Sequence, residues 1–340
     1  MTDQPSAIRE WRGVDAATFR EEIAPAYEPA ILRGVVSQWP AVAHARSSME
    51  SAAGYLDRFD NGAKVHIVVM PPHVRGRMFY NDDMSGFNFS RSTASIREVN
   101  ERLLRHAKFE RPTALAAQHA LLSECLPGFA DENVLSILDA SVQPRLWLGS
   151  AMTTPAHFDE SNNVACVVAG RRRFTLFPPE QTPNLYVGPL GHAPTGTPIS
   201  LVTVAEPDFE RFPRFRDALA QARVAELDPG DALYIPMLWW HHVESLDKYN
   251  AMVNYWWKGA VGSNARADSA LNCLLHALLV LRHLPPEHRQ VWKRLFAYYI
   301  FDADETTFAH IPAEVRGILG DIPPDVARNL KAFLVQQLQR

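Results

Sequence analysis

Apolar positions in the first third of the chain follow two different spacings. Short runs at residues 30–34 and 66–70, the second of them rich in β-branched residues, are typical of strands that stop at Gly or Pro. Residues 48–59 instead place apolar side chains on one side of a helix, and a second helix is predicted after Ser95, which stands at capping-box spacing from a glutamate. Residues 1–132 are therefore predicted to form a mixed α and β region.

Residues 133–260 change to many short β-rich runs separated by turn-forming residues. A series of short strands without intervening helices is typical of a β-barrel or a β-sandwich. We therefore expect a mainly β core with helical additions. The predicted strands are residues 134–138, 145–148, 164–168, 173–177, 232–235 and 251–257.

Residues 261–340 are predicted to be helical because their apolar positions return with helical spacing. The stripes either pack on the chain's own barrel or pair with a second subunit, as in a homodimer, and both interpretations stay open. The expected domains are thus 1–132, 133–260 and 261–340. The first stripe is Leu271, Leu274, Leu275, Leu278 and Leu281, and the second is Val326, Leu330, Phe333 and Leu334.

Composition narrows the possible partners. The 340 residues are 47% hydrophobic, and 34 Lys plus Arg against 38 Asp plus Glu give a net charge of −4, so we expect no polyanion-binding surface and regard nucleic acid as an unlikely partner. No apolar run predicts a signal peptide or a membrane span. The three cysteines (Cys125, Cys166 and Cys273) show no zinc-binding or disulfide spacing, which favours a cytoplasmic setting.

Candidate chemistry is concentrated at His157 and Asp159, which face the same side of an extended chain. His241, after a remote apolar strand, can complete a set of two imidazoles and one carboxylate if a barrel brings the strands together. That set leaves coordination positions open, as a non-haem Fe(II) oxygenase requires for a bidentate co-substrate and O2. His242 falls on the opposite strand face and is interpreted as a packed or backbone-bonded histidine. The same interpretation is given to His66, His276 and His283.

Several ordered blocks between Pro144 and Gly259 resemble the cupin-like Jumonji C (JmjC) oxygenases, and within that family the asparaginyl hydroxylase that acts on hypoxia-inducible factor. The resemblance implies a double-stranded β-helix, that is, a cupin or jelly-roll barrel. It also implies a hydroxylase that uses Fe(II), 2-oxoglutarate and O2, acts on a protein or peptide side chain, and releases succinate and CO2. A small molecule or a modified RNA base stays open as an alternative substrate. The blocks are TPAHFDE at 154–160, FTLFPP at 174–179, ERFP at 210–213, GDALYIPMLWWHHVESL at 230–246 and VNYW at 253–256.

The same resemblance assigns individual residues. It implies that iron is bound by His157, Asp159 and His241. It further implies that the pocket for 2-oxoglutarate is lined by Thr154, Asn163 and Asn254, with Trp256 in its wall.

Two positions depart from the family pattern. Arg172 replaces a lysine that would pair with the far carboxylate of 2-oxoglutarate, and strand alternation favours its pointing inward while Arg171 and Arg173 face solvent. Ala116 replaces a co-substrate-binding tyrosine, so that contact is either missing or supplied by Tyr80 or Arg172.

Two further segments are candidates for the substrate entrance. Residues 79–88 have the composition of a mouth or lid, or of an ordinary structured loop, and residues 181–223 form an insertion that could cover a substrate groove. Two alternatives to the oxygenase stay open: a cupin metalloenzyme that does not use 2-oxoglutarate, and a non-catalytic binding scaffold.

Overall fold

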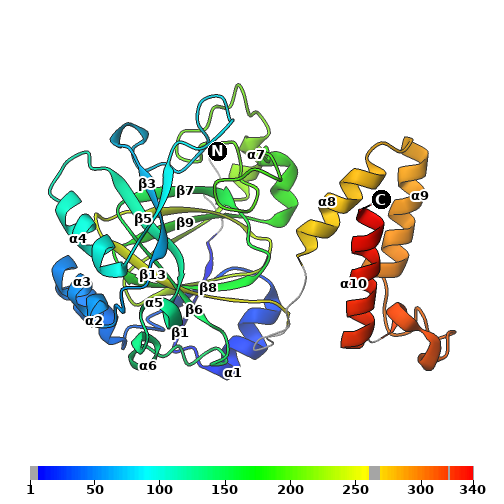
Figure 1. The fold of residues 1–340 in the computed structure, drawn as a ribbon, viewed down its shortest axis with the longest axis horizontal. Helices are drawn as coiled ribbons and strands as arrows, with labels where there is room; N and C mark the ends of the chain where they lie inside the picture. Colours follow the sequence, from blue (N-terminus) through cyan, green and yellow to red (C-terminus); the bar gives the residue numbers. More distant parts are fainter. Residues whose placement is uncertain (1–6, 260–268, 321, 340) are drawn as a thin grey trace. The chain divides into compact units, whose positions relative to one another are not determined.

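The computed structural model describes residues 7–259, 269–320 and 322–339 (Figure 1). The chain divides into two compact units, Met1–Ala267 and Asp268–Arg340. The boundary predicted between residues 260 and 261 lies outside the described residues. The division into three domains stays a prediction.

The first unit is built on a nine-stranded sheet that mixes early and late parts of the sequence. Five of its strands come from residues before 132, so this region and the following one share a single sheet rather than stacking as separate layers. Strands β1 and β2 pair in parallel, and the other neighbours pair antiparallel. The sheet order is β1 (Arg9–Arg12), β2 (Ala30–Arg33), β11 (Ala232–Ile235), β8 (Asn162–Ala169), β13 (Asn250–Trp257), β6 (Pro144–Gly149), β5 (Ala114–Leu121), β3 (Val65–Met70) and β4 (Ser90–Ala94).

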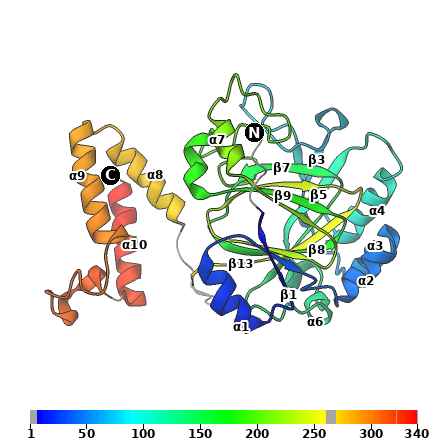
Figure 2. The ribbon, with the colours of Figure 1, turned by 180° about the vertical axis from the view of Figure 1, so that it is seen from behind.

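A smaller, four-stranded antiparallel sheet faces the large one. Its order is β10 (Arg223–Leu227), β9 (Arg172–Phe177), β12 (Trp240–Ser245) and β7 (Met152–His157). Alternate residues of both sheets meet in one buried cluster, for example Val167 and Met252 with Phe174 and Val243. The two layers are visible from both sides (Figure 2). The expected jelly-roll barrel is confirmed.

The opposite face of the large sheet is covered by α2 (Pro40–Ser47), α3 (Met49–Asp57) and α4 (Ile96–His106) (Figure 1). The predicted capping box begins α4: the Ser95 side chain accepts from the Glu98 amide, and the Glu98 carboxylate accepts from the Ser95 amide. The shorter helical segments of this unit are α1 (Ala16–Thr18), α5 (Leu122–Cys125), α6 (Phe129–Glu132), α7 (Phe215–Ala220), the π-helix Phe19–Ile23, and the 3-10 turns Ala24–Ala26, Pro72–Val74 and Pro179–Asn184.

The strand predicted at residues 134–138 is wrong, because the structure has turns there. Leu135 and Ile137 are buried, but they anchor a loop. The carbonyl of Val134 accepts a 2.8 Å hydrogen bond from the indole of Trp39 instead of one from a neighbouring strand. The alternating burial of residues 134–138 therefore resembles that of a strand, although these residues pair with no neighbouring strand.

The second unit contains α8 (Ala270–Leu281), α9 (Pro286–Phe296) and α10 (Pro324–Leu338), with a π-helical turn at Ala297–Phe301 and 3-10 turns at Ala313–Val315 and Gly317–Leu319. Both predicted apolar stripes lie on helices, α8 and α10. No residue of these three helices is fully buried, and Leu279 is 72% exposed. Among the described residues, no helix has the length and apolar character needed to cross a membrane.

Candidate functional site

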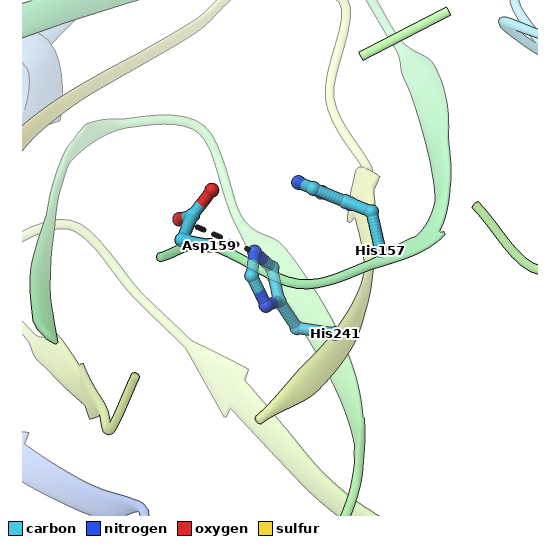
Figure 3. Close-up of side chains that lie close together, drawn as sticks. All are labelled: His157, Asp159 and His241. Carbon is cyan, nitrogen blue, oxygen red and sulfur yellow. Dashed lines mark ion pairs between the residues drawn. The ribbon is translucent and has the colours of Figure 1, made fainter. Parts of the chain in front are cut away.

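His157, Asp159 and His241 meet at one end of the space between the two sheets (Figure 3). His157 ends β7 and is the register partner of His241 on β12, and their ring centroids are 4.2 Å apart. Asp159 follows two residues later, with its Oδ2 3.7 Å from Nε2 of His241. One ligand atom from each residue lies within 4.8 Å of the others. The sheet pairing thus brings together three residues that the sequence separates by 84 positions.

Backbone carbonyls fix how both imidazoles are turned. Nδ1 of His157 lies 2.8 Å from the Pro155 carbonyl, and Nδ1 of His241 lies 2.9 Å from the Trp239 carbonyl. A carbonyl only accepts, so each Nδ1 carries the proton and each Nε2 keeps a free lone pair. Burial, followed by the neighbouring His241, lowers the pKa of His157 well below its ordinary value. Its imidazole is therefore neutral, as metal ligation requires.

The Asp159 carboxylate is oriented by donors from two other strands. Its Oδ2 accepts from the Trp256 indole at 3.1 Å and from the Asn163 amide at 3.5 Å. Burial raises the pKa of Asp159, while His241 and these two donors act in the opposite direction. The network continues outward: Asn254 donates to Asn163 at 3.3 Å, and Trp147 donates to Asn254 at 2.9 Å.

These hydrogen bonds give Asn163, Asn254 and Trp256 a definite structural task. They hold the carboxylate in one orientation beside the two imidazoles. Two histidines and one carboxylate on one side of a point, with an open cavity on the other, is the donor set that suits non-haem Fe(II). The residues present therefore fit iron.

A cavity of about 470 Å³ adjoins the three side chains. Apolar side chains cover part of its wall, including Phe174, Val243 and Met252. All five residues predicted for the co-substrate pocket line it: Thr154, Asn163, Arg172, Asn254 and Trp256. The structure thus brings every predicted site residue to one cavity.

Arg172 is the unusual residue of this cavity. It is 7% exposed, its Nε has no hydrogen-bond partner among the described residues, and burial alone lowers its pKa to about 10. Its neighbours point outward and are paired, Arg171 with Asp247 at 3.0 Å and Arg173 with Glu226 at 2.8 Å. The predicted inward placement of Arg172 is observed. A buried guanidinium without a counter-ion is costly, so an anionic ligand would satisfy it.

The suggestion that Tyr80 supplies the missing tyrosine contact is wrong. Its hydroxyl donates to the His192 carbonyl at 2.5 Å, and Tyr80 does not line the cavity. Ala116 is buried against the register partner Gly149, where β5 and β6 approach closely. Gln118, on the same strand, lines the cavity instead.

Several cavity residues were missed by sequence reasoning. Gln118 and His119 reach the cavity where the β5–β6 register shifts, and His119 has a positive φ of 41°. Alternation along a strand fails at such a bulge, so no pattern identified them. His66 is not a ligand, as expected, but it is exposed and lines the cavity, contrary to the packed or backbone-bonded role predicted for it. Arg91 also lines the cavity and was not identified from the sequence.

The two entrance segments have different roles. Residues 194–196 of the insertion line the cavity, as expected for a cover. Residues 79–88 do not, and they support the insertion from behind: Phe87 stacks on His192 with centroids 4.6 Å apart. Arg91 adds a 3.2 Å hydrogen bond to the Pro194 carbonyl. The interpretation of residues 79–88 as an ordinary structured loop is the one that the structure favours.

His242 faces away from the three converging side chains, as predicted. It is 3% exposed, its Nδ1 has no hydrogen-bond partner among the described residues, and burial lowers its pKa to about 4. The expected hydrogen bond to backbone is therefore not made by this nitrogen.

Comparison with known proteins gives one family and several relatives. The cupin-like domain family matches residues 16–262. Human HSPB1-associated protein 1 is 36% identical over 149 residues, which is 43% of this chain and 30% of the relative. Lysine-specific demethylase 8 of Xenopus tropicalis is 26% identical over 268 residues, or 76% of this chain and 54% of the relative.

A third relative is similar over almost its whole length. The tRNA wybutosine-synthesizing protein 5 of Gallus gallus is 25% identical over 317 residues, covering 83% of this chain and 90% of the relative. By contrast, the chain spans under a third of HSPB1-associated protein 1. The family match covers most of the chain and includes every strand of the two sheets except β1, together with the three converging side chains. The chain therefore belongs to the cupin-like domain family, in its JmjC-type branch.

Proposed function

We propose that this chain is an Fe(II)- and 2-oxoglutarate-dependent oxygenase that hydroxylates a protein or peptide side chain and releases succinate and CO2. One observation carries the proposal: the unpaired guanidinium of Arg172 lines the same cavity as His157, Asp159 and His241. A metal ligand set alone would fit many cupins. A buried cation beside it adds a requirement for an anionic co-substrate, which 2-oxoglutarate meets.

Each residue group has its own part in this proposal. His157, Asp159 and His241 would hold iron, which couples O2 reduction to decarboxylation of 2-oxoglutarate. Arg172 binds the far carboxylate of the co-substrate through its fork of N–H donors, and Thr154 adds a hydroxyl to the same pocket. The Trp256 and Asn163 hydrogen bonds keep Asp159 oriented while ligands exchange. The apolar wall excludes water from the reacting centre.

The charges around the cavity favour hydroxylation of an uncharged or acidic residue over demethylation of a lysine. Among the described residues that line it, Asp159 is the sole carboxylate, and it is engaged with the histidines. Besides Asp159 and the two candidate ligand histidines, the titratable side chains of this lining are Arg91, Arg172, His66 and His119. A lysine ammonium would find no free counter-ion there.

The proposal is tested by binding and turnover together. Under anaerobic conditions Fe(II) and 2-oxoglutarate should bind cooperatively, and admission of O2 should give slow succinate formation above that of His157→Ala, measured by mass spectrometry. The matched control is His242→Asn, which alters the adjacent histidine on the opposite strand face and should keep succinate formation. Succinate at the His157→Ala level in the wild-type protein would overturn the proposal.

The two alternatives give different results in the same titrations. A cupin metalloenzyme of another type would bind metal but show no response to 2-oxoglutarate. A non-catalytic scaffold would bind neither tightly. Arg172 argues against the scaffold, because a pocket that binds no ligand does not explain a buried unpaired cation beside the candidate metal ligands. The 2-oxoglutarate titration distinguishes the other alternative.

We also propose that the helical unit pairs with a second copy of the chain. Large apolar side chains are exposed on all three of its helices, including Leu279, Val291 and Phe333. Light scattering of the wild-type protein should give twice the chain mass, and Leu279→Lys should shift it toward the monomer, whereas His276→Lys should not.

The three free cysteines support the cytoplasmic setting proposed from the sequence.

A further inference from the structure

A second, smaller cavity lies on the other face of the strands that carry the metal-site histidines. Its volume is about 90 Å³, enough for a small ion or a few water molecules. It is bounded by the outer face of β7 and β12 and by residues 202–205 of the insertion. Its polar lining residues are Arg77, Thr153, Thr203 and His242.

His242 reaches this cavity because successive residues of β12, which pairs with β9 without a register shift, point to opposite faces of the sheet. The register of β7 and β12 passes from the His157–His241 pair to the Thr154–Val243 pair, so two residues of β7, Pro155 and Ala156, oppose His242 at a β-bulge in β7. Pro155 in this bulge has no amide proton for the ladder. The imidazole is 3% exposed, and its Nδ1 lacks a hydrogen-bond partner among the described residues. A buried polar atom of this kind needs a ligand.

Arg77 lines the cavity from the opposite side, and backbone hydrogen bonds hold its neighbours in place. Its neighbours hydrogen-bond to the edge of β7, Met78 N to Thr153 O at 3.1 Å and Thr153 N to Gly76 O at 2.9 Å. A side chain at Gly76 would come within 2.8 Å of the Ala151 carbonyl, and the φ of Gly76 is +72°, so this close approach requires glycine. The position of Arg77 at the cavity is therefore fixed by backbone contacts.

The charge of Arg77 is not neutralised. Its guanidinium stacks on the Phe79 ring, 4.0 Å from the centroid, but it makes no hydrogen bond or ion pair with any described side chain. Glu206 attracts it from a distance without lining the cavity. The net effect of its surroundings, dominated by burial, is to lower the pKa of Arg77. Two donors without partners thus face one small space, and one of them is a cation.

We propose that this cavity is a binding site for a small oxyanion, held by the Arg77 guanidinium and the His242 imidazole. The fork of Arg77 matches two oxygens of a phosphate or carboxylate, and the unpartnered Nδ1 of the His242 imidazole donates one further hydrogen bond. The Thr153 hydroxyl is available to the same ligand. The site lies behind the metal-bearing strands and is separate from the cavity of Arg172, so it does not depend on the function proposed above.

Binding is tested on the full-length, metal-free protein with inorganic phosphate and, in a separate arm, acetate. At constant ionic strength, replacement of chloride by phosphate should raise the midpoint of thermal unfolding, because a ligand that binds only the folded state stabilises it. Isothermal titration calorimetry should give a dissociation constant that Arg77→Gln weakens at least tenfold. Arg77→Lys should recover part of the affinity.

Two control variants separate this site from other basic groups. Arg75→Gln changes an exposed arginine of the same loop that does not line the cavity, and it should leave phosphate binding unchanged. Arg172→Met empties the other cavity of its cation and should also keep the effect, whatever happens to 2-oxoglutarate binding. The proposal is overturned if the wild-type protein shows no anion-dependent shift, or if Arg77→Gln shows the same shift as the wild type.

Discussion

The Trp256 indole donates a 3.1 Å hydrogen bond to the Asp159 carboxylate, although the two residues are 97 positions apart. Trp256 comes from β13 of the large sheet, whereas Asp159 follows β7 of the small one. This bond therefore crosses the barrel. It links the orientation of a candidate iron ligand to the packing of the two sheets.

The first prediction concerns this bond. Trp256→Phe keeps a ring in the cavity wall but removes the donor to Asp159, so Fe(II) affinity should fall by about 10- to 100-fold, the usual effect of losing a hydrogen bond to a metal ligand. Anaerobic titration of the metal-free protein measures it. Trp257→Phe is the matched control, because this neighbour packs on the other sheet face and its buried Nε1 has no partner among the described residues. Equal losses in both variants would contradict the assigned role.

The second prediction concerns Arg172, whose replacement should raise thermal stability and weaken 2-oxoglutarate binding. Arg172→Met removes a buried, unpaired cation, so the protein without ligand should become more resistant to thermal unfolding. The same change should weaken 2-oxoglutarate binding by about 10- to 100-fold through loss of charge-assisted hydrogen bonds. Calorimetry and thermal unfolding on one preparation measure both. Arg173→Met, outward on the same strand and paired with Glu226, should not weaken binding. A stabilised Arg172→Met that binds 2-oxoglutarate normally would refute the pairing.

The third prediction concerns the position of the absent tyrosine. Ala116 is packed among Val68, Met70 and Met78 and lies against Gly149, where an added Cβ would approach the Ala116 Cβ to 2.7 Å. Ala116→Tyr should therefore overpack this region and destabilise the protein by roughly 1–3 kcal/mol, measured by urea unfolding. It should not improve 2-oxoglutarate affinity. Tighter binding at unchanged stability would show that the tyrosine contact can simply be restored.

The fourth prediction is a pH dependence far from the site. Lys64 and the Ser95 amide donate to the exposed Glu98 carboxylate and lower its pKa below 4.5. Because the folded-state pKa lies below that of the unfolded chain, Glu98 stabilises the fold fully above pH 4.5 and loses this contribution as the pH falls through its lowered value. Acid unfolding followed by circular dichroism should show a smaller loss of stability over this range in Glu98→Gln. An identical pH profile in both proteins would contradict the stabilising role assigned to the ionised Glu98 carboxylate.

The three candidate ligands could be predicted from the sequence because the evidence for them is local or lies in a long block of family-like residues. His157 and Asp159 share a strand face, and His241 lies in a long block of family-like residues. Arg172 was placed inward by strand alternation, which holds because β9 is regular. The barrel followed from short β-rich runs. In each case a local pattern and the tertiary structure agree.

The remaining features depend on contacts that no local pattern contains. Gln118 and His119 face the cavity through a bulge, and the segment at residues 134–138 was mistaken for a strand because its buried side chains alternate. Strands β1 and β4 were missed because their side chains are mostly exposed, so they lack an apolar signal. Their pairing with neighbouring strands, rather than their own composition, makes them strands.

The small sheet carries the candidate iron ligands or the turn next to them, whereas other segments form the cavity mouth. All four of its strands lie within residues 152–245, so the three candidate ligands and Arg172 come from one continuous stretch of chain. The cavity mouth instead draws on β3, β4, β5 and residues 194–196. Exchange of residues 190–198 between relatives should therefore transfer substrate preference while the reaction stays the same. The candidate iron ligands and the residues around the cavity mouth thus come largely from different segments of the chain.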